Sequence, residues 1–367
     1  MKWLALLIGM MVTLGAALQI PGSRVLNGEN DFFSLYSGAR LSGSGELHSV
    51  EAHQRIAREA RVPFMQSVLF TRPDYYAFLL RPLGWLPYRT AYWLFQSMSL
   101  AALVVLLWLM RDQKSTWMLA LCSIPLVTVY ANGQDVMLIG LALTGVFLLE
   151  KNGWRFVAGL LLSFCTVKFH LFLFVPIALV AQRKWKLCAG AMVGLAAEIL
   201  AASATEGSRW IPRYVQFLQN PQISPTPFPL NFHSAVEALN WNPRPEWLFT
   251  GAMLVAIFCL AFRLPDFGSV LGLCVFGGML TSRHVGLHDY ALLLPLCAMA
   301  ESAVKRTLFW LATPPVYISM LLPGSWGTLG VIVLSMSLPL AYLLAVPGYG
   351  LIPRYSGTRT AYNPVAQ

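Results

Sequence analysis

Apolar residues in this chain gather in long uninterrupted runs that short polar turns separate. A run of roughly 20 apolar residues is long enough to cross a bilayer as a helix. The pattern therefore predicts an all-α polytopic membrane protein with about twelve transmembrane helices, several of them short, as expected where broken helices line a cavity. The predicted spans are 3–20, 91–110, 117–130, 136–149, 156–167, 171–181, 188–204, 247–262, 269–281, 291–300, 308–322 and 329–346.

Two longer polar segments, 21–90 and 205–246, interrupt the spans, and we expect both to be loops on the same face of the membrane. The first run, 3–20, has small residues near its end like a cleaved signal peptide. It is nevertheless long enough to span, and many similar runs follow it, so an uncleaved first helix is the preferred interpretation. We therefore expect residues 1–367 to form a single integral membrane domain.

The first long loop contains two segments with patterns of their own. Residues 75–86 are apolar but too short to span, and Pro73 and Pro87 bracket them, which predicts an interfacial or re-entrant helix. Residues 49–61 have the pattern of an amphipathic helix with a mixed-charge face. Such a helix either rests on the bilayer surface or is a solvated surface helix, and the sequence leaves both open.

Composition agrees with the membrane interpretation. Apolar residues make up 57% of the chain and charged residues only 11%, whereas roughly a quarter of an average soluble domain is charged. A soluble enzyme, a nucleic-acid-binding protein and a disordered chain are therefore excluded. The cysteines form no CxxC pair and lie within or beside apolar runs, which indicates neither disulfides nor a thiolate metal site; they are Cys122, Cys165, Cys188, Cys259, Cys274 and Cys297.

The formal charge of +10 comes largely from short turns between the apolar runs. If the N-terminus is cytoplasmic, every short inner turn is basic, as the positive-inside rule requires. These turns contain Arg111 and Lys114, Lys151 and Arg155, Arg183, Lys184 and Lys186, Arg263, and Lys305 and Arg306. The chain is thus predicted to be a multi-pass protein of the cytoplasmic (inner) membrane.

This topology places the ionisable side chains on one side. All the histidines and four aspartates close to the membrane boundary fall on the outer side: His48, His53, His170, His233, His284, His288, Asp31, Asp74, Asp135 and Asp289. Ionisable groups at membrane depth are costly and usually line a functional cavity. The function is therefore expected at the outer face.

Two of the polar patches have structural explanations as good as the functional ones. Asp31, among apolar and aromatic neighbours, is either a catalytic base or a helix N-cap, and composition alone favours the cap. Arg72 either clamps an anion with two hydrogen bonds or pairs with Asp74 at the interface. The sequence gives these two interpretations of Arg72 equal weight.

A third patch combines Gln134 and Asp135 at one predicted outer turn with Lys168 and His170 at another. A lone lysine normally extends toward the membrane surface. Here it stands between two short apolar runs beside a histidine, which favours a phosphate ligand.

The fourth patch contains Arg283, His284, His288 and Asp289. The two histidines share a face if this segment is helical. Their spacing fits no standard zinc site, so anion binding or proton handling is preferred and no metal is assigned. The chain also lacks GxxxxGK[ST], GxGxxG and DxD motifs, which disfavours a nucleotide-dependent reaction and any bound cofactor.

In order along the chain, these patches resemble glycosyltransferase family 87 of the C superfamily, whose best-known members are polyprenol-phosphate-mannose-dependent α-1,2-mannosyltransferases. The resemblance covers most of the chain. It differs at Asp74, where a second proline is usual, and at Arg283, where proline is common. The matching segments are Asp31-Phe32, 72–83, 133–135, 158–160, 168–171, His284, His288-Asp289 and 292–295.

The resemblance implies a membrane glycosyltransferase that moves mannose or another hexose from a polyprenyl-phosphate donor to a glycolipid or polysaccharide. Asp31 is implied as the catalytic base and His288 as a contact of the donor phosphate. Arg72, Lys168 and Arg283 would neutralise the departing phosphate, and direct displacement would invert the anomeric centre. Gln134, Asp135, His170, His284 and Asp289 complete the expected substrate site.

Two other functions fit the same outer basic cavity. A transporter or flippase for lipid-linked sugars would move the intact lipid and would not need Asp31 as a base. An O-antigen ligase or polymerase would act on lipid diphosphates instead. A scaffold without an active site is disfavoured by the one-sided histidines and carboxylates.

Overall fold

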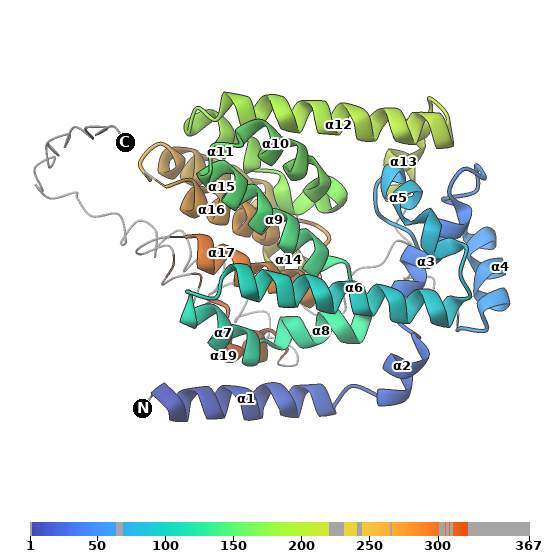
Figure 1. Cartoon of the computed structure of the whole chain (residues 1–367), viewed down its shortest axis with the longest axis horizontal. Coiled ribbons are helices and arrows are strands. Elements are labelled where there is room, and N and C mark those ends of the chain that lie inside the picture. The colour runs from blue at the N-terminus through green and yellow to red at the C-terminus, as the bar shows by residue number, and fades with distance from the viewer. Residues whose placement is uncertain are drawn as a thin grey trace, which may run out of the picture.

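The computed structural model describes residues 2–63, 69–219, 231–240, 244–264, 266–300, 305, 308 and 311–321, and every regular element in this part of the chain is a helix (Figure 1). The helices in order are α1 (Lys2–Leu18), α2 (Gly22–Asn27), α3 (Phe32–Leu41), α4 (Val50–Ala60), α5 (Asp74–Gly84), α6 (Tyr88–Leu109), α7 (Lys114–Leu121), α8 (Ile124–Asn132), α9 (Val136–Lys151), α10 (Arg155–Phe164), η1 (Cys165–Phe172), α11 (Val175–Ala181), α12 (Trp185–Glu206), α13 (Trp210–Leu218), α14 (Phe232–Ala238), α15 (Arg244–Ala261), α16 (Phe267–Thr281), η2 (Leu287–Leu292), α17 (Leu293–Met299) and α19 (Pro314–Leu321).

Three helical stretches of the described chain are long and apolar enough to cross a membrane: α6, the continuous stretch 155–172, and α12. A fourth span is formed if α1 and the segment 22–41, which meet at a bend of 71°, count as one. The chain is therefore a membrane protein. The larger number of about twelve spans stays a prediction, and the predicted span 329–346 lies outside the described residues.

The helix boundaries differ from the predicted ones around residue 168. The predicted span 156–167 continues through the 3₁₀ segment η1 to Phe172, and α11 follows separately. The proline-bracketed segment 75–86 forms the short helix α5. The amphipathic segment 49–61 forms α4, where the Ser49 hydroxyl accepts a hydrogen bond from the Ala52 amide.

The apolar side of α4 is covered by the protein itself. Ala52, His53, Ile56 and Ala57 are buried, and the helix packs against α3. The opposite side of α4 is exposed and charged. This arrangement supports the surface-helix interpretation, because the apolar face is already occupied.

The short helices α2 to α5 and α13 gather at one end of the long ones (Figure 1). In Figure 1, α1, α6 and α12 run roughly parallel, and α2 to α5 and α13 lie at the end where α6 begins and α12 finishes. Close packing fixes the position of α12 against α10, since a Cβ added at Gly159 would meet the Leu187 carbonyl and one at Gly190 the Phe156 carbonyl. Small residues permit such close helix approach in membranes.

Candidate active site

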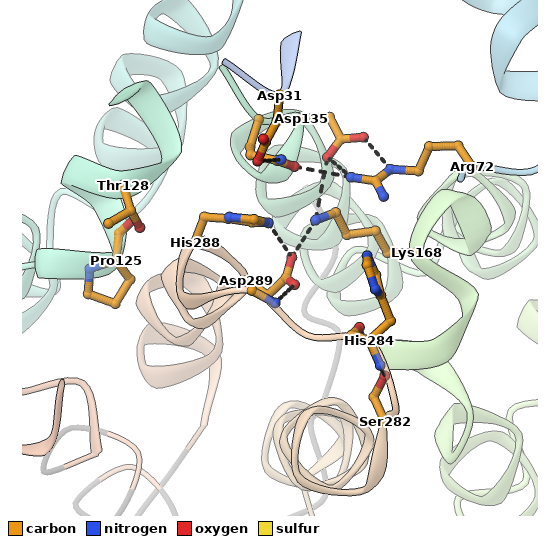
Figure 2. A network of polar contacts seen from close by, with 12 residues as sticks. Asp31, Arg72, Pro125, Thr128, Asp135, Lys168, Ser282, His284, His288 and Asp289 are labelled. Atoms are coloured by element: carbon orange, nitrogen blue, oxygen red, sulfur yellow. Dashed lines mark hydrogen bonds and ion pairs between the residues drawn. The ribbon is translucent and has the colours of Figure 1, made fainter. Parts of the chain in front are cut away.

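The structure brings together side chains from five separate parts of the chain (Figure 2). Asp31 precedes α3, Gln134 and Asp135 form the turn between α8 and α9, and Lys168 belongs to η1. Arg72 enters from the segment before α5, and His288 and Asp289 come from η2. Residues separated by more than 250 positions in the sequence thus meet in one cluster.

A glycine turn brings Gln134 close to Asp31. Gly133 ends α8 in the left-handed conformation, with φ of 61°, which favours glycine over residues with a side chain. A Cβ there would lie 2.7 Å from the Phe32 Cβ and 3.0 Å from the Asn30 Oδ1. Asn30 itself donates to the Ala131 carbonyl at 2.9 Å. The start of α3 therefore lies directly against this turn.

Asp31 occupies the N-cap position of α3, but its side chain makes no capping hydrogen bond. Its Oδ2 instead accepts a hydrogen bond from Gln134 Nε2 at 2.8 Å. The cap interpretation that composition favoured is therefore wrong for the side chain. The carboxylate is half-buried and has no ion-pair partner among the described residues.

Arg72 holds Asp135 with two hydrogen bonds. Its Nε donates to Asp135 Oδ2 at 3.0 Å, and its Nη2 donates to Asp135 Oδ1 at 3.2 Å and to Gln134 Oε1 at 3.1 Å. This is the geometry of a bidentate clamp on a carboxylate. The predicted pairing of Arg72 with Asp74 is wrong, because Asp74 Oδ1 lies 3.1 Å from His48 Nε2 instead.

Lys168 lies between two carboxylates. Its ammonium donates to Asp289 Oδ1 and lies 3.7 Å from Asp135 Oδ1. The backbone leaves helical geometry at Lys168, with φ of −116° and ψ of 53°. The second oxygen of Asp289 accepts from the Gly286 amide at 2.8 Å.

We call Arg72, Gln134, Asp135, Lys168 and Asp289 the buried charge network. Each of these residues is at most 7% exposed, so the charges depend on one another for compensation. Burial by itself raises the pKa of the Asp135 carboxyl, but the charges of Arg72 and Lys168 outweigh this and hold that pKa below its usual value. Two cations and two carboxylates balance, and the carboxylate of Asp31 lies at the edge of this balanced set.

The three histidines of the predicted site, His170, His284 and His288, lie around the same cluster. His288 Nε2 is 3.7 Å from Asp289 Oδ1, and the rings of His170 and His284 are 6.0 Å apart at their centroids. His170 Nε2 is buried and has no hydrogen-bond partner among the described residues. His284 and His288 do not share a helical face, because η2 begins only at Leu287.

Arg283 lies apart from the buried charge network. Its Nε is 3.4 Å from Glu246 Oε1, and its guanidinium lies over the Trp247 ring at 5.6 Å from the centroid. The side chain is 64% exposed. It is a predicted site residue that the structure does not bring into contact with the network.

Tyr76 was not predicted as a site residue. Its hydroxyl is buried and has no hydrogen-bond partner in the described part of the chain, and its electrostatic interactions are with Asp135 and Arg72. The aromatic pair that follows Asp74 was the only sequence signal for it. Over the same described residues, no group of three or more histidines, cysteines and carboxylates is arranged to hold a metal ion.

The arrangement can accept a proton and receive an anion. Asp31 has lone pairs free of any cation, whereas the carboxylates of Asp135 and Asp289 are engaged by cations. The rings of His170, His284 and His288 offer nitrogen donors around the same cluster. Fold and site together define a membrane protein with a cluster of ionisable groups between its helices.

A family model described as glycosyltransferase family 87 matches residues 70–282, which is 213 of the 367 residues. The chain belongs to this family and is therefore a glycosyltransferase. The matched stretch includes Arg72, Gln134, Asp135 and Lys168, while Asp31 and His288 lie outside it. No curated protein and no solved structure gives a significant match to the chain.

Proposed function

We propose that this protein transfers a hexose, mannose in the first instance, from a polyprenyl-phosphate donor to a glycolipid or polysaccharide acceptor. The reaction takes place at the outer face of the cytoplasmic membrane. The single observation that supports this best is the contrast among the site carboxylates. Among the described residues, the side chain of Asp31 is held by the neutral amide of Gln134 alone, whereas Asp135 and Asp289 are ion-paired.

In the proposed reaction, the Asp31 carboxylate takes the proton of an acceptor hydroxyl. The acceptor oxygen forms a bond to the anomeric carbon while the bond from that carbon to the phosphate oxygen breaks. The electron pair of the broken bond leaves with polyprenyl phosphate, which needs no proton to depart. Attack from the side opposite to the phosphate inverts the anomeric centre. General-base assistance of this kind typically contributes about 10²- to 10⁴-fold in rate.

The donor phosphate needs cationic or N–H donors that the protein has not already used. Lys168 and Arg72 are engaged by carboxylates, so we assign the direct phosphate contacts to His288, His284 and His170. Arg72, Gln134, Lys168, Asp135 and Asp289 orient these groups and supply the local positive charge. Arg283 joins the site only if it leaves Glu246.

The outer location rests on the charge at the two ends of α12. Arg183, Lys184 and Lys186 precede or begin this membrane-spanning helix. Short basic turns lie on the cytoplasmic side. Because Glu206 ends the same helix, the end that includes Glu206 and the short helices α3 to α5 faces outward.

The test is incubation of the purified protein in nanodiscs with synthetic polyprenyl-phosphate-mannose and candidate glycolipid acceptors, followed by mass analysis of the lipids. We expect a product heavier by one hexose with inverted anomeric configuration. Asp31→Asn should lower the transfer rate at least 100-fold while the protein remains folded. Asp112→Asn, which removes an exposed carboxylate from the α6–α7 turn, is the matched control.

Transfer by Asp31→Asn at the wild-type rate would remove Asp31 from the base position. Movement of the intact donor lipid between leaflets without any glycosylated product would identify a flippase instead. Activity with lipid diphosphates alone would indicate a ligase or polymerase.

A further inference from the structure

A pocket lies near the buried charge network. It has a volume of about 680 Å³ and is lined by the segment 45–49, the start of α5, the end of α12 and one side of α13. This volume falls within the range of roughly 300–1,000 Å³ found for sites of small organic ligands. We call it the His48–Glu206 pocket.

The pocket has more negative than positive charge. Asp74 is 1% exposed and lies against His48, and Glu206 is 7% exposed and accepts a hydrogen bond from the Gly43 amide at 2.5 Å. Arg213 is the arginine that lines it, and this side chain donates to the Glu206 backbone carbonyl. Two carboxylates against one guanidinium disfavour an anionic ligand such as a phosphate.

The other lining groups suit a ligand rich in hydroxyls. Gln216 and Gln219 present exposed amides, which both donate and accept hydrogen bonds, while carboxylates only accept them. Phe217 stacks on the His48 ring, with 4.5 Å between the centroids, and adds an apolar surface. A sugar ring combines hydroxyl groups that donate and accept with faces made of C–H groups.

The pocket and the network share one short segment of chain. Arg72 belongs to the network, and Asp74, two residues later, lines the pocket. Tyr214 of α13 fixes this segment, because its hydroxyl donates to the Thr71 carbonyl at 2.9 Å. A ligand in the pocket therefore lies against the same short segment that carries Arg72.

We propose that the His48–Glu206 pocket binds the sugar portion of the acceptor, a neutral polyhydroxylated glycan. This proposal rests on the proposed transferase function and assigns the second substrate of that reaction. The donor is excluded from the pocket by its phosphate, which the carboxylates repel. The Asp74 and Glu206 carboxylates accept hydrogen bonds from sugar hydroxyls, and the Gln216 amide adds donors.

Binding is tested first without any reaction. Saturation-transfer NMR on the protein in amphipol uses methyl α-D-mannopyranoside, methyl β-D-glucopyranoside, methyl β-D-galactopyranoside and, as an anion, methyl phosphate. We expect saturation transfer to at least one sugar. Gln216→Trp should abolish this signal by filling the pocket, and Asp31→Asn should leave it intact. A sugar signal that survives Gln216→Trp, or no sugar signal in the wild type, overturns the proposal.

The second test separates acceptor binding from donor binding. In Glu206→Gln the side-chain oxygen that accepts from Gly43 remains, but the charge is lost. Loss of a hydrogen bond to a charged group should raise the acceptor KM about ten-fold or more, with kcat within two-fold and the donor KM unchanged. Glu59→Gln is the matched control, because Glu59 is an exposed carboxylate on α4 that pairs with Arg40.

The outcomes distinguish this proposal from the proposed function. Transfer with an acceptor KM that neither Glu206→Gln nor Gln216→Trp alters would leave the transferase assignment standing and refute the pocket assignment. If the protein binds sugar in a way that depends on Gln216 but transfers no hexose, the pocket assignment would stand and the transferase assignment would be refuted.

Discussion

The carboxylates of the candidate site differ in their partners. Asp135 and Asp289 are buried against Arg72 and Lys168, so each charge exists only because its counter-charge is present. Asp31 accepts a hydrogen bond from Gln134 and is not bound to a cation in the described part of the chain. A free lone pair on a partly buried carboxylate is what proton abstraction requires.

The mutual dependence of these charges predicts how Lys168 variants behave. Lys168→Met leaves Asp289 buried without its partner, and removing one member of a buried ion pair costs about 3–5 kcal/mol. The double variant Lys168→Met/Asp289→Asn should recover about half of that loss, because the uncompensated charge of Asp289 is gone. Thermal unfolding in detergent measures both variants. A double variant that is less stable than Lys168→Met would contradict the pairing.

Buried His53 predicts a pH dependence of stability. Its Nε2 donates to the Leu47 carbonyl at 3.0 Å, and its Nδ1 lies 2.7 Å from the Ser37 hydroxyl. Burial lowers the pKa of His53 from 6.5 to about 4, so between these pH values the unfolded chain binds more protons than the folded one. The free energy of unfolding should therefore fall as the pH is lowered from about 6.5 to 4, by about 3 kcal/mol.

The measurement for His53 is the melting temperature of wild type and His53→Gln across this pH range. Their difference isolates the contribution of His53 from that of the other histidines. Parallel curves for the two proteins would show that His53 is not the buried neutral group.

At the scale of elements, the site depends on how closely short segments approach. The turn 133–135 lies against the start of α3, and Gly133 permits this both by its positive φ and by its lack of a Cβ. The same turn supplies Gln134 to Asp31 and Asp135 to Arg72 and Lys168. A displacement of this turn would disturb base and network together.

A comparison of Gly133→Ala with Gly153→Ala separates the effect of the close contact between the 133–135 turn and α3 from the effect of backbone strain. Both glycines have positive φ, 61° and 86°, but an added Cβ at Gly153 meets nothing within 4 Å. Both variants should lose about 1–2 kcal/mol of stability from the left-handed conformation. Only Gly133→Ala should also lose transfer activity, by ten-fold or more, in the mass assay of lipid products. Equal activity in the two variants would show that the turn does not position Asp31.

At the scale of the whole molecule, the long helices separate a basic end from an end that contains the site. α12 has 22 residues, about 33 Å at 1.5 Å per residue, which matches the hydrocarbon core of roughly 30 Å. Basic residues lie where α12 begins, while α2 to α5 and α13 lie where it finishes (Figure 1). The His48–Glu206 pocket includes the last residue of α12. The proposed function therefore assigns the chemistry to the end where α12 finishes.

This polarity predicts the labelling of engineered cysteines. In a cysteine-free background, Glu46→Cys should react with a membrane-impermeant maleimide in intact spheroplasts, because Glu46 is exposed at the site end. Lys186→Cys, exposed at the start of α12, should react only after permeabilisation. The reverse pattern would place the site on the cytoplasmic face.

The sequence by itself determined the class of the protein and predicted a set of site residues. Apolar runs must be helices in a bilayer because backbone groups have no other partners there. The ordered patches around Asp31, Arg72, Asp135 and Lys168 identified family 87, which the family match confirms. These features are local along the chain, so pattern and residue type are sufficient to reveal them.

Only the tertiary structure decided which residue pairs with which. From the sequence, Asp31 was either a base or a cap, and Arg72 either clamped an anion or paired with Asp74. The folded chain gives them Gln134 and Asp135 as partners. It separates Arg283 from the network and forms a pocket from Asp74 and Glu206, which are 132 positions apart. The physical reason is that partners of buried charges are chosen by packing across distant segments, which local pattern does not record.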